Sequence, residues 1–116
     1  MWAWLEVSPQ HVFPNERGEK EQMAVGVAQN AVRDPHAPPT GDSVGLRTGS
    51  LSESGSLGRS YHAGADEKAP DSIPHGYNFA EQWEHALRED PRFIFVTGWN
   101  EWIGERLDSF MGIQNR

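Results

Sequence analysis

The fold prediction starts from residues 93–102, Phe-Ile-Phe-Val-Thr-Gly-Trp-Asn-Glu-Trp. The stretch opens with apolar residues that do not alternate with polar ones. This pattern is typical of a strand covered on both faces, usually in a parallel sheet. The run stops at Gly98 and continues into a carboxylate between two indole rings. Functional groups of α/β barrels lie at the C-terminal ends of the strands, so this segment is the first candidate for a site.

A helix is predicted over residues 79–89, directly before this strand. Asn78 is a candidate N-cap, and Glu81, three residues later, completes the pattern of a capping box. The Asp90-Pro91 pair ends the helix. The predicted apolar stripe is formed by Phe79, Trp83, Ala86 and Leu87. On the polar side, Glu84 and Arg88 have the spacing of an i,i+4 ion pair.

Two more stretches have the composition of strands, at residues 2–7 and 23–29. A helix, a short turn and a buried strand make up half of a βαβ unit, whose strands are parallel. We therefore predict an α/β fold: a partial (β/α)8 barrel with about three parallel strands, one clear helix and long loops. Residues 33–60 are rich in Gly, Ser, Pro and Thr without periodicity, which predicts a flexible loop.

The composition excludes several classes of partner. The chain has 116 residues and a net charge of −7, and it lacks the clustered Lys and Arg that bind nucleic acid or anionic membranes. The first residues resemble a strand rather than a signal peptide, and no apolar run is long enough to span a bilayer, so no compartment is assigned. With no cysteine and no His-x-His or His-x3-His spacing, we expect no cofactor and no metal site.

Glu101 is the leading candidate for a catalytic or sugar-binding carboxylate. Asn100 precedes it, and the indoles of Trp99 and Trp102 flank it. Indole faces stack on the apolar faces of pyranose rings, and a carboxylate between them can transfer protons or stabilise an oxocarbenium charge. The alternative is a solvated glutamate after a strand, with both tryptophans in the core.

Glu105 is the candidate for a second carboxylate, and its role depends on the local conformation. In a helix the side chains of Glu101 and Glu105 lie about 5–6 Å apart at Cβ, near the separation of a retaining glycosidase pair. In an extended chain they lie roughly 13 Å apart, too far to flank one bond. Glu105 is then a surface charge.

Polar residues near the other predicted strands are candidates for contacts with sugar hydroxyls. Glu6 either reaches the C-terminal end of the sheet as a further carboxylate or points outward. Gln29-Asn30 ends a strand and supplies either ligand hydrogen bonds or ordinary turn chemistry. Arg59 and His62 follow the glycine-rich tract, as in a substrate loop or in an ordinary polar loop.

At residues 99–102 the chain resembles a group of glycan-processing (β/α)8 barrels that includes glycoside hydrolase family 99 endomannosidases and WbsX-like polysaccharide proteins. Their Asn-Glu-Trp motif follows a late barrel strand and matches Asn100, Glu101 and Trp102. The resemblance implies that Glu101 acts on a sugar 2-hydroxyl. The family's acid/base glutamate comes three residues later, where this chain has Gly104, and Glu105 follows one position further.

The wider resemblance covers the last third of such barrels, so we expect a C-terminal fragment. Residues 1–110 would belong to the barrel and 111–116 would form a tail. The predicted function is that of a glycoside hydrolase-like domain acting on a glycan substrate. The alternatives are a non-catalytic carbohydrate-binding or interaction module and an inactive truncated fragment. Unpaired strand edges would permit self-association.

Overall fold

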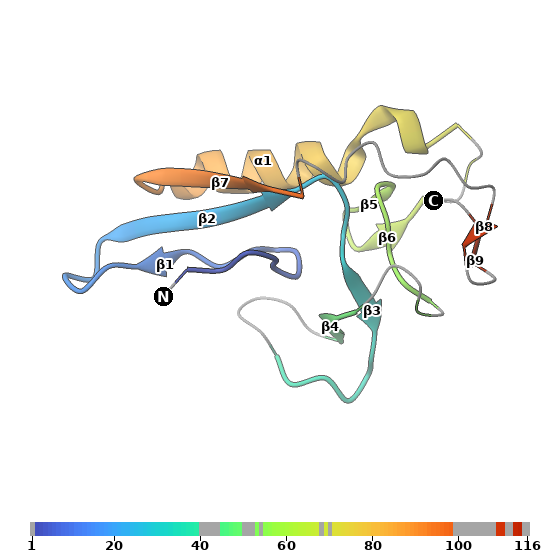
Figure 1. Ribbon diagram of the computed structural model, residues 1–116, viewed down its shortest axis with the longest axis horizontal. Helices are drawn as coiled ribbons and strands as arrows, with labels where there is room; N and C mark the ends of the chain where they lie inside the picture. The colour runs from blue at the N-terminus through green and yellow to red at the C-terminus, as the bar shows by residue number, and fades with distance from the viewer. Residues whose placement is uncertain are drawn as a thin grey trace.

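A three-stranded sheet with one helix packed on it lies on one side of the molecule, at the left of Figure 1. The computed structural model describes residues 2–39, 45–49, 53, 55–67, 69 and 71–98, together with the backbone of 109–110 and 113–114. The sheet has the order β1-β2-β7. Its strands are β1 (Phe13–Pro14), β2 (Lys20–Gly26) and β7 (Phe93–Thr97).

The direction of the strands argues against the predicted partial barrel. β2 and β7 are parallel, in register from Gln22 opposite Phe93 to Gly26 opposite Thr97. β1, however, joins the other edge of β2 antiparallel. The remaining described strands form separate two-stranded antiparallel pairs. The prediction of a (β/α)8 barrel with about three parallel strands is therefore wrong. The continuous apolar run predicted burial of β7 on both faces, which is also wrong, because Phe93 and Phe95 are exposed on one face. Such a run does not reveal how many strands surround it.

The predicted strand at residues 2–7 is also wrong, because no described residue of this segment belongs to a strand. Its contact with β2 runs through a side chain instead. The backbone N–H of Ala3 donates to Oε1 of Gln22 at 3.2 Å, and Nε2 of Gln22 donates to the Ala3 carbonyl at 3.0 Å. The primary amide of Gln22 thus replaces the peptide group of a neighbouring strand. Residues 2–7 therefore have the composition of a strand but do not pair with the sheet as a strand.

Helix α1 (Tyr77–Glu89) ends where the sequence predicted, with Asp90 as its C-cap in the left-handed conformation. Its beginning differs from the prediction. Gly76 occupies the N-cap position without a side-chain cap, so the capping box of Asn78 and Glu81 is not formed. Asn78 lies inside the helix, where it is fully buried. The short 3₁₀ helix η1 (Ile73–His75) leads into α1.

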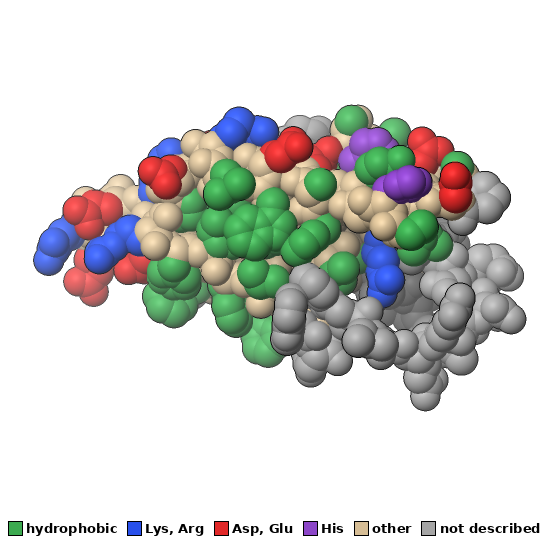
Figure 2. Space-filling model, turned by 90° about the horizontal axis from the view of Figure 1, so that it is seen from above, with side chains coloured by type: hydrophobic (Ala, Val, Ile, Leu, Met, Phe, Trp, Pro, Cys, Tyr) green, Lys and Arg blue, Asp and Glu red, His purple; other side chains and the backbone are tan. Residues whose placement is uncertain are grey.

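The buried face of α1 is more polar than the predicted apolar stripe. Its buried residues are Asn78, Gln82 and Ala86. Phe79 and Trp83 are half-buried and pack against the core of Met23, Val25 and Ala86 together with Val12 and Ile94. Leu87 is 65% exposed. Viewed from above, hydrophobic side chains reach the surface in a group at the middle of the molecule (Figure 2).

A second small core lies where the chain leaves the sheet between β2 and α1. The elements here are β3 (Ala31–Arg33), β4 (Leu46–Thr48), β5 (Tyr61–His62) and β6 (Ala65–Asp66). β3 pairs antiparallel with β4, and β5 with β6. The core consists of Val7, Ala31, Leu46, Leu57 and Tyr61. The described part of the predicted 33–60 loop therefore contains paired backbone, in strands too short to show a sequence period. Two further short strands, β8 (Ser109–Phe110) and β9 (Ile113–Gln114), pair with each other.

Buried amide side chains connect the sheet, the helix and the second core. Oε1 of Gln82 accepts the Gly26 N–H at 2.7 Å, and Nε2 of Gln82 donates to Oδ1 of Asn78 at 2.6 Å. Nδ2 of Asn78 donates in turn to the Tyr61 carbonyl at 2.9 Å. Nε2 of Gln10 donates both to the Ala24 carbonyl and to the Gln82 carbonyl, each at 3.0 Å. We call Gln10, Gln82 and Asn78 the amide network.

We expect Gln82→Ala to lower the free energy of unfolding by about 2–4 kcal/mol, because it leaves the partly buried Gly26 N–H and the buried Asn78 Oδ1 without partners. Urea denaturation followed by circular dichroism measures the change. Leu87→Ala is the control on the same helix, and the exposed position predicts a change within about 0.5 kcal/mol. Equal effects of the two substitutions would contradict the role given to the network.

Candidate functional site

Two aromatic pairs lie on the face of the sheet opposite α1. Trp2 meets Phe93 edge-to-face with ring centroids 4.7 Å apart, and Trp4 meets Phe95 in the same manner at 6.5 Å. Side chains alternate along a strand, so Phe93 and Phe95 point away from the helix, whereas Ile94 packs in the core beneath it. We call Trp2, Trp4, Phe93 and Phe95 the aromatic row.

The aromatic row remains open to solvent although its members touch one another. The exposed fractions are 57% for Trp2, 68% for Trp4, 37% for Phe93 and 45% for Phe95. Nε1 of Trp2 donates to Oε2 of Glu21 at 2.7 Å, which fixes the orientation of that indole. Such rings offer a large apolar surface at a low cost in conformational entropy when a ligand binds.

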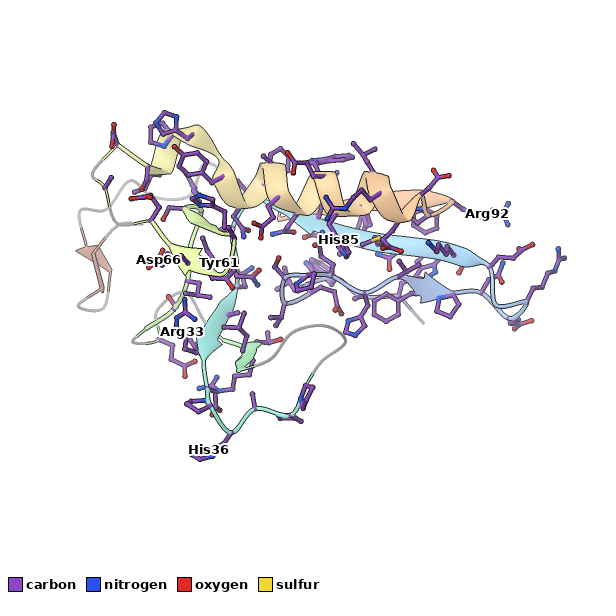
Figure 3. The ribbon with its side chains drawn as sticks, turned by 180° about the vertical axis from the view of Figure 1, so that it is seen from behind. Arg33, His36, Tyr61, Asp66, His85 and Arg92 are labelled. Carbon is purple, nitrogen blue, oxygen red and sulfur yellow. The ribbon has the colours of Figure 1, made fainter. Side chains whose placement is uncertain are left out.

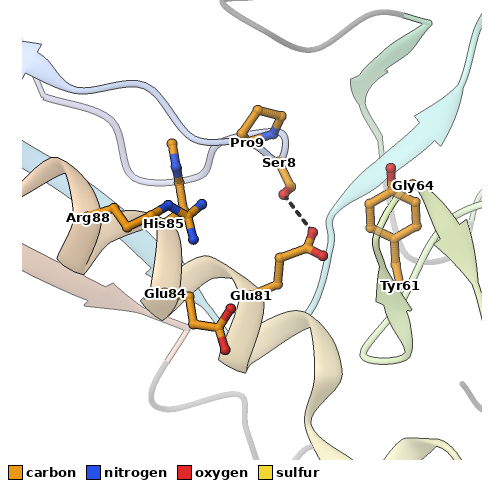
Figure 4. Close-up of a pocket in the computed structure, with 8 residues that line it drawn as sticks. All are labelled: Ser8, Pro9, Tyr61, Gly64, Glu81, Glu84, His85 and Arg88. Carbon is orange, nitrogen blue, oxygen red and sulfur yellow. Dashed lines mark hydrogen bonds between the residues drawn. The ribbon is translucent and has the colours of Figure 1, made fainter.

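A cavity of about 380 Å³ lies beside α1, between the helix, the segment around Ser8 and the β5–β6 turn (Figure 4). Its volume falls within the usual range for small-molecule sites. None of its lining residues belongs to the aromatic row, so the two features are separate. The lining residues are Ser8, Pro9, Tyr61, Gly64, Glu81, Glu84, His85 and Arg88.

Two residues of the cavity wall are fixed by the surrounding structure. The Glu81 carboxylate accepts the Ser8 hydroxyl at 3.4 Å and the Ala63 N–H. Tyr61 is buried in the second core, with the guanidinium of Arg33 6.0 Å from its ring centroid (Figure 3). Burial raises the pKa of the Tyr61 phenol, Arg33 opposes the shift, and Glu81 adds to it. The phenol therefore remains a neutral wall of the cavity.

The structure uses two of the predicted binding residues for internal contacts. Nδ1 of His11 lies 2.6 Å from Oε2 of Glu6, so this carboxylate has a protein partner. Gln29 is fully buried. Its Oε1 accepts the Ser8 N–H at 2.9 Å, and its Nε2 donates to the Glu6 carbonyl at 3.4 Å. Glu6 and Gln29 are thus brought together, but as part of the fold.

The remaining predicted residues in the described part lie away from the aromatic row. Asn30 accepts the Gly49 N–H through its backbone carbonyl. The Arg59 carbonyl accepts the N–H of Asn78 at the start of α1. The ring of His62 lies tilted against that of Tyr77, with ring centroids 4.4 Å apart. Trp99, Asn100, Glu101, Trp102 and Glu105 lie outside the described residues.

Sequence reasoning overlooked both described surfaces. In the aromatic row, the continuous apolar run hid the alternation that exposes Phe93 and Phe95 on one face. The cavity residues of α1 had a visible signal, because Glu81, Glu84, His85 and Arg88 share one helix face at i, i+3, i+4 and i+7. Glu81 was instead interpreted as part of a capping box, and Glu84 and Arg88 as an i,i+4 ion pair.

Within the described ranges, no group of three or more potential ligand side chains is placed to hold a metal ion. No helix in this part of the chain is long and apolar enough to cross a membrane. No protein-family model, curated protein or solved structure matches the chain.

The raised pKa of Tyr61 predicts that stability falls at alkaline pH. Above the ordinary phenol pKa of 10.0, Tyr61 ionises in the unfolded chain while the folded chain still holds it neutral, so rising pH favours unfolding. We expect Tyr61→Phe to lose less stability than the unchanged protein between about pH 8 and about pH 11. Urea midpoints of both proteins at the two pH values test this, and parallel losses would contradict it.

Proposed function

We propose that this chain binds a neutral glycan through the aromatic row. The observation that carries the proposal is the exposure of two tryptophans and two phenylalanines on one face of a sheet. Aromatic rings suit sugars because a pyranose presents an apolar face that can stack and hydroxyl groups that remain hydrated. Successive members of the row on β7 lie about 6.6 Å apart along the strand, on the scale of a sugar ring.

The surroundings of the row support a neutral sugar over other ligands. Glu21 next to Trp2 offers a carboxylate oxygen to a hydroxyl group, and the net charge of −7 disfavours an anionic chain. The indole of Trp2 is already oriented before a ligand arrives, which reduces the entropy lost on binding.

The cavity supports binding rather than hydrolysis as the activity of the described part. A glycosidase places its two carboxyl groups on opposite sides of the scissile bond. Glu81 and Glu84 project from the same face of one helix and therefore from one wall. Glu81 is also engaged by Ser8 and Ala63.

Trp4→Ala tests the proposal, because Trp4 is the most exposed member of the row. We expect affinity for a soluble neutral polysaccharide to fall about 2- to 12-fold, the loss that corresponds to about 0.5–1.5 kcal/mol for one aromatic contact. Affinity electrophoresis in gels containing mannan, xylan or β-glucan gives the dissociation constants.

Leu87→Ala is the matched control, since it removes an exposed apolar side chain outside the row. It should leave the mobility shift unchanged. Absence of retardation by all three polysaccharides, or equal losses in the two variants, would overturn glycan binding through the row. Concentration-dependent sedimentation that Trp4→Ala abolishes would show instead that the row joins two copies of the chain.

Glycoside hydrolysis is the second candidate, favoured by the parallel pair β2 and β7. The C-terminal ends of these strands meet at one edge of the sheet, and Asn100-Glu101 follows β7 closely in the sequence. In this alternative Glu101 acts on the sugar and Glu105 is the second carboxylate.

We expect Glu101→Gln to lower any measured turnover by about 10²- to 10⁴-fold, because it removes a proton-transfer group and keeps the shape. Release of reducing ends from mannan measures turnover, and binding to the same polymer should persist. Full retention of activity in Glu101→Gln would exclude Glu101 as the catalytic group.

A further inference from the structure

The cavity beside α1 carries opposite charges that form no direct ion pair with each other, although Arg88 helps Lys20 to lower the pKa of the neighbouring Glu89. Glu84 and Arg88 are exposed residues of its wall, one helical turn apart. Their i,i+4 spacing would permit an ion pair, with about 5–6 Å between the Cβ atoms. The ion pairs of the described residues do not include one between them. The neighbouring Glu89 is bonded by Lys20 at 2.9 Å instead.

His85 adds a hydrogen-bond acceptor on the same wall. Its Nε2 lies 2.9 Å from the Gln10 carbonyl. A carbonyl oxygen only accepts, so Nε2 carries the hydrogen, and in the neutral ring Nδ1 keeps its lone pair. The helix wall therefore offers a carboxylate and an imidazole nitrogen for a cation, and a guanidinium for an anion (Figure 4).

The lining residues other than Glu84, His85 and Arg88 supply apolar surface or have polar groups that are already hydrogen-bonded within the protein. Pro9 and the buried ring of Tyr61 supply apolar surface, and the phenol of Tyr61 stays neutral because burial raises its pKa. The Glu81 carboxylate is occupied by Ser8 and Ala63. A ligand with a single charge can contact only Glu84 or only Arg88, whereas a ligand with both charges can contact both groups.

We propose that this cavity binds a small zwitterion, a free α-amino acid with an apolar side chain. The ammonium group contacts Glu84 and His85, the carboxylate contacts Arg88, and the side chain packs on Tyr61 and Pro9. This site goes beyond the proposed glycan binding, because it shares no residue with the aromatic row. It gives the chain a second ligand that is independent of the first.

Isothermal titration calorimetry with L-leucine tests the proposal directly on the full chain. Two analogues each lack one charge: isoamylamine has no carboxylate, and isocaproate has no ammonium group. We expect leucine to bind more tightly than either. We expect Arg88→Gln and Glu84→Gln each to weaken leucine binding about 10- to 100-fold, as for the loss of a hydrogen bond between charged groups.

Arg92→Gln and Glu16→Gln are the matched controls for Arg88→Gln and Glu84→Gln. Each removes an exposed charge of the same sign from a residue that does not line the cavity. They should leave the dissociation constant of leucine unchanged. Trp4→Ala should also leave it unchanged, so failure of this site and failure of glycan binding can be told apart. No binding of leucine at millimolar concentration, equally tight binding of isoamylamine, or unchanged affinity in both charge variants would overturn the proposal.

Discussion

The arrangement of this protein depends on the hydrogen bonds of Gln82. Its side chain accepts a hydrogen bond from the Gly26 N–H at the end of β2 and donates one to Asn78, one turn earlier in α1. Its backbone carbonyl accepts a hydrogen bond from the Gln10 side chain. One buried residue thus connects the sheet, the helix and the irregular segment that precedes β1. Buried polar groups are costly unless each finds a partner, so these contacts specify one arrangement of the elements more strictly than apolar packing would.

The contacts between the sheet, α1 and the second core are polar because of the path that the chain takes. Between β2 and β7 the backbone leaves the sheet, forms β3 to β6 and returns through α1. A chain of 116 residues buries a smaller fraction of its surface than a large domain does. The buried apolar clusters found among its described residues are two small cores. Amides fill the space between the cores. Asn78 reaches Tyr61 in the second core, and Gln29 holds the backbone of Ser8.

The aromatic row and the cavity both follow from the way α1 and the N-terminal segment pack on the sheet. Seating α1 on one face of β2 and β7 leaves the opposite face for the N-terminal segment, which brings Trp2 and Trp4 beside Phe93 and Phe95. The Ser8–Gln29 contact places the following residues alongside the helix, where the cavity forms. The first surface offers aromatic rings and the second offers separated charges, so the two suit chemically different ligands.

The sequence by itself determined local features: the β7 strand, the end of α1 at Asp90-Pro91 and the acidic balance of the chain. Each follows from neighbouring residues or from composition. Tertiary structure decided the roles of the individual polar side chains, because each role depends on which distant residues pack against that side chain. Asn78 has the sequence pattern of an N-cap, but its side chain is buried and donates to the Tyr61 carbonyl. Residues 2–7 have the composition of a strand, but the Ala3 carbonyl pairs with the Gln22 side-chain amide and not with a neighbouring strand. Glu6 pairs with His11 inside the protein. The number and direction of the strands rest on long-range contacts that no local pattern encodes.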